Sequence, residues 1–473
     1  MSSRQLPVPQ QDAACPAAWW RGVGAALWLL ILLGSLLRLW EVWQHNPLDH
    51  IWSDPQRYWD EARGTLEASP MSVFDPPLYQ LWLSLVQKLS LGARELIAAY
   101  TGLLSIATPW LWYRFLREAL RSRLLALGGW AVLVWLPTWI GIYSYFMTET
   151  LLLPLLGASL WQTLRADRRR SVGSFVGMAA LWLLTGLTRV VALPLGALAC
   201  LLVWIGHPLR WRAAAWTAFV AVLVMAPLGY RNYHYVRLWA PWGNPWLANI
   251  YAESGKREIQ LRLRRDGAVW GYGFTTPAMD RTPFEPLSDW TPARRGTVFV
   301  DVDLNAGARD WRAALEATAV HGRERLWLRL ENLIDVLCGD SWPDNNRAYL
   351  MGAVQIEFRW VWAPLFLLVI AWSAWRWRAT LRRPLLPVLI AAWFLVQAVS
   401  LLSVNEGRYR KPFEGLLIAQ LLVLMDQRQR RAAPGAGGRM VSSTRIPGRA
   451  LSPCLSAARP RRPSSRTRPT AAA

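Results

Sequence analysis

Long stretches of mostly apolar residues are the feature that most restricts how this chain can fold. Crossing about 30 Å of hydrocarbon takes roughly 20 apolar residues in a helix, and a helix satisfies all of its backbone hydrogen bonds internally. The chain of 473 residues is 53% hydrophobic and 18% charged, which fits a polytopic membrane protein. We therefore predict an all-α polytopic membrane protein with about ten transmembrane helices, at residues 23–43, 95–116, 124–142, 148–165, 172–188, 190–206, 213–230, 357–375, 384–403 and 412–426.

Arginine clusters in the short segments between these helices predict the orientation. All of the clusters fall on one side, and the basic tail from Arg428 onward falls on the same side: Arg114/Arg117/Arg121/Arg123, Arg165/Arg168/Arg169/Arg170, Arg210/Arg212 and Arg376/Arg378/Arg382/Arg383. Basic residues in short loops mark the cytoplasmic side of a membrane. Both termini are therefore expected in the cytoplasm, and the long loops 44–94 and 231–356 are expected outside.

This topology predicts five regions along the chain. They are a cytoplasmic N-terminal segment (1–22), an N-terminal transmembrane core that includes the first outer loop 44–94 (23–230), an extracytoplasmic loop domain (231–356), C-terminal transmembrane helices (357–426) and a basic, disordered cytoplasmic tail (427–473). The tail prediction rests on its richness in Ala, Pro, Arg and Ser.

Two short helices are expected in the first outer loop and one longer helix in the large loop. Asp54-Pro55 reads as a helix N-cap followed by proline at the first helical position. Residues 78–91 are apolar but too short to span, which predicts a helix at the membrane interface. In the large outer loop, residues 309–337 predict a single helix.

The net charge of +22 does not indicate nucleic acid, because the excess lies beside apolar segments and in the tail. Membrane lipids are the expected partner of these arginines. The chain contains no nucleotide-phosphate loop, no dinucleotide-binding glycine pattern and no His-rich zinc motif, so no cofactor is predicted. A divalent metal remains an alternative, resting only on the dispersed histidines His45, His50 and His234.

Asp54 is the leading candidate for a catalytic base. A carboxylate that follows a membrane span can meet both a sugar carried on a lipid phosphate and an acceptor arriving from water. The alternative is that Asp54 only caps a helix. Asp60 and Glu61 follow on the same expected helix, about 100° apart, so they cannot both face one site.

Other polar residues lie at the outer ends of the predicted spans. Candidates for acid–base or acceptor-side roles are Asp60, Glu61, Asp75 and Glu149. A donor phosphate requires fixed positive charge, which arginine supplies in bidentate geometry. The candidates for binding the donor phosphate or shaping the site are Arg57, Tyr58, Arg189, Arg231, Asn232, Arg408 and Tyr409. Taken one at a time, such arginines are more often interfacial residues whose charged ends reach the headgroups.

The predicted spans contain almost no ionisable residues in their interiors. An ion-coupled transporter normally has acidic or basic groups near mid-membrane. This pattern favours chemistry at the outer surface, although a transporter or flippase for a lipid-linked sugar, and a non-catalytic protein that binds a lipid-linked glycan, remain alternatives.

Several short motifs occur in a characteristic order. They are Asp54-x-x-Arg57-Tyr58-x-x-x-Ala62-Arg63, Pro76-Pro77-Leu78-Tyr79, the helix start at Glu149, Gly186-Leu187-Thr188-Arg189, Pro227-x-x-x-Arg231-Asn232-Tyr233 and Arg408-Tyr409-Arg410-x-Pro412. In this order they resemble the GT-C membrane glycosyltransferases, especially the bacterial relatives of protein O-mannosyltransferases and lipid A aminoarabinose transferases. Two positions depart from the family pattern. Pro55 stands where many members have Glu, and Asp75 stands where a basic residue or His is common.

The resemblance implies a function, a site and a location. It implies inverting transfer of a sugar from a polyprenyl-phosphate carrier to an extracytoplasmic glycan, lipid or protein acceptor. Asp54 would be the catalytic aspartate, and Arg189, Arg231 and Arg408 would bind the phosphate or shape the site. It also implies a bacterial inner (plasma) membrane protein whose active site faces the periplasm or the cell exterior.

Overall fold

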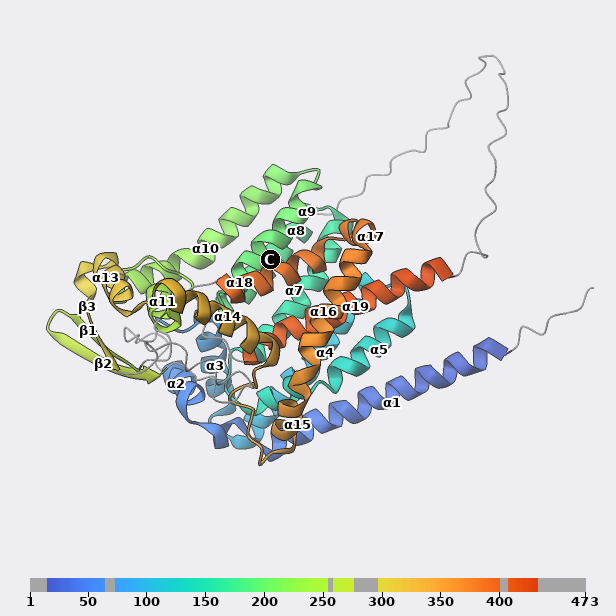
Figure 1. Cartoon of the computed structure of the whole chain (residues 1–473), viewed down its shortest axis with the longest axis horizontal. Helices are drawn as coiled ribbons and strands as arrows, with labels where there is room; N and C mark the ends of the chain where they lie inside the picture. Colours follow the sequence, from blue (N-terminus) through green and yellow to red (C-terminus); the bar gives the residue numbers. More distant parts are fainter. Residues whose placement is uncertain (1–14, 64–72, 254–257, 276–296, 400–406, 433–473) are drawn as a thin grey trace, which may run out of the picture. The chain divides into compact units, whose positions relative to one another are not determined.

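A computed structural model describes residues 15–63, 73–253, 258–275, 297–399 and 407–432. Within these ranges the chain is mostly helical, as predicted (Figure 1). The described residues up to Gln429 form one compact unit. Most of the predicted tail lies outside the described residues, but its first residues, 427–432, continue the last helix.

Helices account for the N-terminal half of the described chain. The first helix is α1 (Cys15–Gln44). Three short elements follow it, in the order expected for the first outer loop: η1 (Pro47–His50), α2 (Ser53–Arg63) and α3 (Pro77–Ser90). The predicted spans from 95 to 230 coincide with the next elements: α4 (Arg94–Ala119), α5 (Arg123–Val134), α6 (Pro137–Gly141), η2 (Ile142–Ser144), α7 (Glu149–Arg169), α8 (Val172–Thr188), α9 (Ala192–Ile205) and α10 (Arg210–Val236).

Three helices in the described ranges are long and apolar enough to cross a membrane. They are Gly22–Gln44, Arg210–Val236 and Leu350–Trp375, and a fourth span results if the bent pair Arg123–Val134 and Pro137–Ser144 is counted as one. The other predicted spans coincide with helices that are shorter or less apolar. A membrane-protein character is therefore supported by fewer segments than the sequence predicts.

The predicted span 124–142 is broken, and proline is the physical cause. Pro137 starts α6, and Leu136 before it is extended (φ −68°, ψ 112°) because a residue that precedes proline is disfavoured in the α region. The two halves meet at 61°. The break leaves the last carbonyls of α5 without partners inside the helix.

Arg38 supplies those missing partners. Its guanidinium donates to the carbonyls of Leu133 (2.9 Å) and Val134 (2.8 Å) at the end of α5 and to that of Trp139 (2.8 Å) in α6. Arg38 is fully buried, although it lies within α1. Arg38 is an ionisable residue within a predicted span, and its place beside α5 has a physical reason, because a cation stabilises the free carbonyls at the C-terminal end of a helix.

The region 231–356 differs most from expectation. Three strands form a sheet of order β2-β1-β3, with β1 (Glu258–Arg265) antiparallel to β2 (Ala268–Thr275) and parallel to β3 (Thr297–Asp303). Apolar residues of this sheet pack with Trp311 and Ala314 in a hydrophobic core separate from that of the helices. The all-α prediction is therefore wrong for this region. The elements around the sheet are helical: α11 (Pro245–Glu253), η4 (Leu304–Ala306), α13 (Ala308–Thr318) and α14 (Gly322–Cys338).

The single helix predicted at 309–337 is two helices. It is interrupted at Ala319, which is extended and ends α13, and α14 then begins at Gly322. α14 packs against α16 and α18 of the C-terminal part. That part consists of α15 (Leu350–Phe358), η5 (Arg359–Val361), α16 (Trp362–Trp375), α17 (Trp377–Leu381), α18 (Leu385–Val399), η6 (Gly407–Arg410) and α19 (Lys411–Ala432).

Buried charges fix the start of α19 to α14 and to the segment that follows it. Arg410 donates to the carbonyls of Val336 (3.2 Å) and Gly339 (2.9 Å) at the C-terminal end of α14, which have no partners inside the helix. Arg410 also pairs with Glu414, and Lys411 pairs with Asp344 at 2.8 Å. The side chains of Arg410, Lys411 and Glu414 are fully buried. This network holds η6, and hence Arg408, in a defined position.

Candidate functional site

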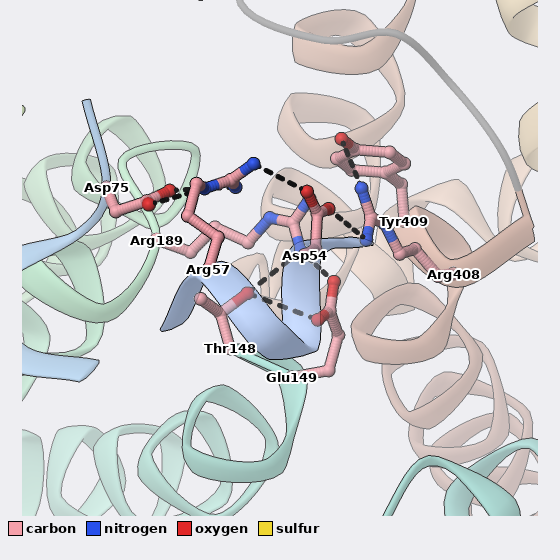
Figure 2. A network of polar contacts seen from close by, with 8 residues as sticks. All are labelled: Asp54, Arg57, Asp75, Thr148, Glu149, Arg189, Arg408 and Tyr409. Atoms are coloured by element: carbon pink, nitrogen blue, oxygen red, sulfur yellow. Dashed lines mark hydrogen bonds and ion pairs between the residues drawn. The ribbon is translucent and has the colours of Figure 1, made fainter. Parts of the chain in front are cut away.

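The ends of several helices bring together residues that are far apart in the sequence. Figure 2 shows Asp54 and Arg57 from α2, Asp75 from the turn before α3, Thr148 and Glu149 at the start of α7, Arg189 at the end of α8, and Arg408 and Tyr409 from η6. We call these eight residues the charged cluster. All of them except Thr148 are among the candidates that the sequence predicts for catalytic, acid–base or phosphate-binding roles.

Asp54 lies between two arginines. Its carboxylate accepts a hydrogen bond from Arg57 Nη1 at 2.7 Å and one from Arg408 Nη1 at 3.1 Å. Its side chain is 19% exposed. The helix α2 begins at Ser53, so Asp54 lies in its first turn rather than at the predicted N-cap position. The carboxylate engages arginine side chains, and a capping role alone does not account for it.

Asp75 and nearby aromatic rings orient Arg57. The Arg57 guanidinium makes a bidentate contact with Asp75, with Nε–Oδ2 at 2.8 Å and Nη2–Oδ1 at 3.1 Å. It also lies over the rings of Tyr58 and Phe74. Asp75 itself is only 2% exposed. Carboxylate–guanidinium pairs of this geometry are strong and directional, so Arg57 is presented to Asp54 in one orientation.

Arg408 is held by aromatic groups. Its guanidinium lies 5.0 Å from the ring centroid of Trp342 and 5.2 Å from that of Tyr409. The buried network at Arg410 and Lys411 fixes the turn that carries it. Arg408, which is far from Asp54 in the sequence, is therefore held in a fixed position from which it contacts Asp54.

Arg189 and Glu149 form a further ion pair of the charged cluster, beside Arg408 and Tyr409. Arg189 forms an ion pair with Glu149, and its guanidinium lies 4.1 Å from the centroid of the Tyr409 ring. Thr148 accepts a hydrogen bond from Arg189 (3.3 Å) and donates one to Glu149 (3.1 Å). An acidic residue at the start of α7 and a basic one at the end of α8 both complement the helix dipoles.

The arginines determine the protonation of Asp54. Burial by itself would raise the pKa of the carboxyl, but the positive charges of Arg57 and Arg408 outweigh this effect and hold its pKa below the usual value. Asp54 is therefore ionised at neutral pH, as a base must be. A carboxylate with a lowered pKa is, however, a weak base as long as both arginines stay paired with it.

Glu61 has the opposite character. Burial, the negative charge of Asp75 and a hydrogen bond to Asp75 raise its pKa to about 9. Glu61 also accepts a hydrogen bond from Gln80 at 2.8 Å. At neutral pH it is protonated and donates to Asp75 rather than acting as a base. Its role is to help hold the carboxylate that orients Arg57.

The raised pKa of Glu61 predicts a pH-dependent stability. Between about pH 4.5 and pH 9 the folded chain holds a proton on Glu61 that the unfolded chain has lost, so this residue lowers stability as pH rises, by up to about 1.4 kcal/mol per pH unit. Glu61→Gln keeps a donor for Asp75 and removes the titration. We expect the variant to be more stable than wild type at pH 8 and equally stable near pH 5. Thermal unfolding of the solubilised protein across this range tests it, and an unchanged pH profile would show that Glu61 is already ionised.

The other predicted site residues fall outside the charged cluster. Asp60 is exposed on α2. Asn232 is buried within α10, and its side chain donates to the carbonyl of Ala240 at 2.5 Å, which fixes the loop that follows this helix. Arg231 lies within electrostatic reach of Glu61, at the edge of the site. Tyr58 is buried beneath Arg57 and meets the ring of Tyr79 edge to face.

Two residues that contact the site are not predicted from the sequence. Thr148 links Glu149 to Arg189, and Trp342 lies against Arg408. Thr148 has a local signal, because a threonine commonly precedes the first turn of a helix. Trp342 has none, since its importance depends on contacts with η6, more than sixty residues along the chain.

The described residues contain no group of three His, Cys, Asp or Glu side chains that could hold a metal ion. His45 and His50 approach one another, with ring centroids 6.4 Å apart, whereas His234 lies against Tyr235. No protein-family model, curated protein or solved structure gives a significant match to the chain.

Proposed function

We propose that the chain is a membrane glycosyltransferase of the GT-C type, with about ten transmembrane helices. It moves a sugar, with inversion, from a polyprenyl-phosphate carrier to an extracytoplasmic glycan, lipid or protein acceptor. The observation that carries the proposal is the placement of Asp54: a single ionised carboxylate between two arginines, each independently held by its neighbours.

The proposed reaction uses these groups in one displacement. The acceptor hydroxyl oxygen attacks the anomeric carbon and forms the new glycosidic bond, while Asp54 takes the hydroxyl proton. The bond between the anomeric carbon and the phosphate oxygen breaks with its electron pair, and the polyprenyl phosphate leaves from the opposite face of the sugar. Arg57 and Arg408 stabilise the charge that develops on the leaving phosphate.

Binding of the donor phosphate should make Asp54 a stronger base. A phosphate that binds to Arg57 or Arg408 competes with Asp54 for the same guanidinium groups. The negative charge of a phosphate bound to these guanidinium groups offsets part of their positive charge at Asp54, so the pKa of Asp54 rises toward a value suited to a general base. In the free enzyme Asp54 is thus ionised but weakly basic, and donor binding makes it a stronger base.

The Glu149–Arg189 pair is assigned to shaping the site. Glu149 is fully buried, and its partner Arg189 presents its face to Tyr409 next to Arg408. A buried pair with a hydrogen-bonding threonine gives a rigid boundary. In the proposed enzyme, this boundary restricts where the sugar can lie relative to Asp54.

The proposed location follows from the arginine clusters. They favour cytoplasmic termini and a charged cluster on the outer side of a bacterial inner membrane. A lipid-phosphate donor fits this placement, because Asp54 lies in the first α-helix after α1, with η1 between them. Its isoprenoid tail would remain in the bilayer while the phosphate reached the arginines.

A donor panel in isolated membranes tests the proposed function. Membranes with and without the overproduced chain are incubated with several radiolabelled polyprenyl-phosphate sugars. A glycosyltransferase releases the polyprenyl phosphate and places the label in a new product of inverted anomeric configuration. A flippase or a non-catalytic binding protein leaves the sugar–phosphate bond of every donor intact, and that result would reject the proposal.

Replacing Arg408 predicts a shift in the pH dependence of transfer. Arg408→Gln removes a charge that lowers the pKa of Asp54, so this pKa rises. Because a carboxylate base loses its activity as pH falls through its pKa, the acid limb of the free-enzyme pH profile should move to higher pH. The ratio kcat/KM measured against pH checks this shift. A drop in rate with an unmoved acid limb would assign Arg408 to donor binding alone.

A further inference from the structure

A cavity of about 740 Å³ lies next to the charged cluster but is not part of it. Its lining includes His50 from η1, Trp52 just before α2, Tyr145 after η2, and Trp342 and Tyr349 from the segment between α14 and α15. The volume lies within the range of about 300–1,000 Å³ that is common for small-molecule sites. Neither Asp54 nor Arg57 lines it.

Aromatic rings form much of the cavity wall. Trp52 and Trp342 meet edge to face, with centroids 5.4 Å apart. His50 lies between Tyr145 (4.5 Å) and Tyr349 (5.5 Å). These contacts hold the rings in fixed orientations, so flat apolar faces are available without the entropy cost of ordering flexible side chains.

Polar groups are placed among these rings. Asp340 accepts a hydrogen bond from Asn345 at 2.9 Å, and both residues line the cavity with Asn346. His50 is 6% exposed, and its Nε2 has no hydrogen-bond partner within the part of the chain that the structure describes. Burial lowers its pKa, so its imidazole is neutral at pH 7. The cavity thus offers hydrogen-bond donors and acceptors alongside its aromatic surfaces.

The charges of the lining are balanced. Its carboxylates are Asp49 and Asp340, and its guanidinium groups are Arg347 and Arg359. Two of these four groups are paired with residues outside the lining, Asp49 with Arg94 and Arg347 with Glu357, which leaves one carboxylate and one guanidinium group. A site for a phosphate would carry an excess of positive charge, and one for an isoprenoid chain would be aliphatic, whereas Ile356 and Pro343 are the only aliphatic side chains among the described residues of this lining.

Two tryptophans connect the cavity with the charged cluster. Trp52 is separated from Asp54 only by Ser53, and Trp342 contacts Arg408 while also lining the cavity. The wall that carries Trp342 is fixed to η6, because the Gly407 N–H donates to the carbonyl of Asp340 at 2.8 Å. A ligand in the cavity therefore lies beside the proposed base, on the far side of the Trp52–Trp342 pair.

We propose that this cavity binds the acceptor, and that the acceptor presents an uncharged carbohydrate. The apolar C–H faces of a pyranose ring pack on aromatic rings, and its hydroxyls pair with carboxylates, amides and imidazole nitrogen. The assignment of the ligand as acceptor rests on the proposed glycosyltransferase function. The binding of a neutral carbohydrate does not, and it is measurable without any transfer.

Saturation-transfer NMR with short neutral hexose oligosaccharides tests the inference on the full solubilised chain. Trp52→Ala and Tyr349→Ala remove cavity rings at partly exposed positions, which limits the damage to the fold. Trp375→Ala is the matched control, because Trp375 is 81% exposed on α16 and does not line the cavity. We expect wild type, Trp375→Ala and Asp54→Asn to bind, and both cavity variants to bind at least about tenfold more weakly.

The possible results distinguish carbohydrate binding in the cavity from the proposed transfer reaction. Binding by Asp54→Asn that is lost in Trp52→Ala and Tyr349→Ala supports the cavity, even if the wild type transfers no sugar and the proposed function fails. Binding that is lost in Asp54→Asn but kept in both cavity variants would place the ligand in the charged cluster and overturn the inference. Failure of every neutral oligosaccharide to bind wild type would overturn it as well.

Discussion

Asp54→Asn should reduce sugar transfer by about 10²- to 10⁴-fold, the usual contribution of a positioned general base. Asparagine has the same shape but cannot accept the acceptor proton. It also removes the negative charge that pairs with Arg57 and Arg408, so donor phosphate should bind the variant at least as well as wild type. The predicted signature is a lower kcat with donor affinity retained, measured by steady-state transfer and by equilibrium binding of the donor.

Asp60→Asn is the matched control for this experiment. It makes the same chemical change on the same helix, at an exposed side chain outside the charged cluster. Its transfer rate should stay within about twofold of wild type, because surface substitutions away from special features have small effects. Equal losses in both variants would indicate that damage to α2, rather than loss of a base, explains the result.

Lys411→Met should destabilise the protein by about 3–5 kcal/mol. Lys411 is fully buried, donates to the Thr138 carbonyl at 2.6 Å, and pairs with Asp344 at 2.8 Å. Methionine fills a similar volume but leaves the buried carboxylate of Asp344 without its cation. Titration of the solubilised protein with a denaturing detergent gives the free energy of unfolding.

Two variants identify the uncompensated charge as the cause. Lys88→Met makes the same substitution at an exposed position of α3 and should cost less than about 1 kcal/mol. Adding Asp344→Asn to Lys411→Met removes the orphaned carboxylate, so the double variant should recover much of the lost stability. If the double variant were as unstable as Lys411→Met, lost packing around the lysine stem would be the main cause of the destabilisation.

Much of the helical framework is predictable from local sequence signals. Apolar runs predict helices at α1, α4 and α7 to α10, and the short apolar segment at 78–91 predicts α3. The strands β1, β2 and β3 are not predicted, because their pairing depends on partners outside each strand. The break before Pro137 is compatible with the sequence, but its repair by Arg38 requires a contact almost 100 residues away.

The candidate site is only partly predictable. The sequence predicts that Asp54, Arg57, Glu149, Arg189 and Arg408 lie on one side of a membrane, and their meeting in the charged cluster is compatible with this prediction. It does not predict that Asp75 orients Arg57, since this contact depends on how the first outer loop folds back. The cavity depends even more on tertiary structure, because Trp52 and Trp342 lie far apart in the sequence.

Transfer by the purified chain, reconstituted in lipid vesicles, is the most direct test of Asp54 as the base of a glycosyltransferase. A polyprenyl-phosphate sugar labelled in the sugar is supplied with membrane-derived acceptors, and released polyprenyl phosphate and labelled product are quantified together. We expect wild type to yield equal amounts of polyprenyl phosphate and labelled product, and Asp54→Asn to yield almost none of either at equal donor binding. Equal transfer by wild type and Asp54→Asn, or intact donors throughout the panel with wild type, would contradict it.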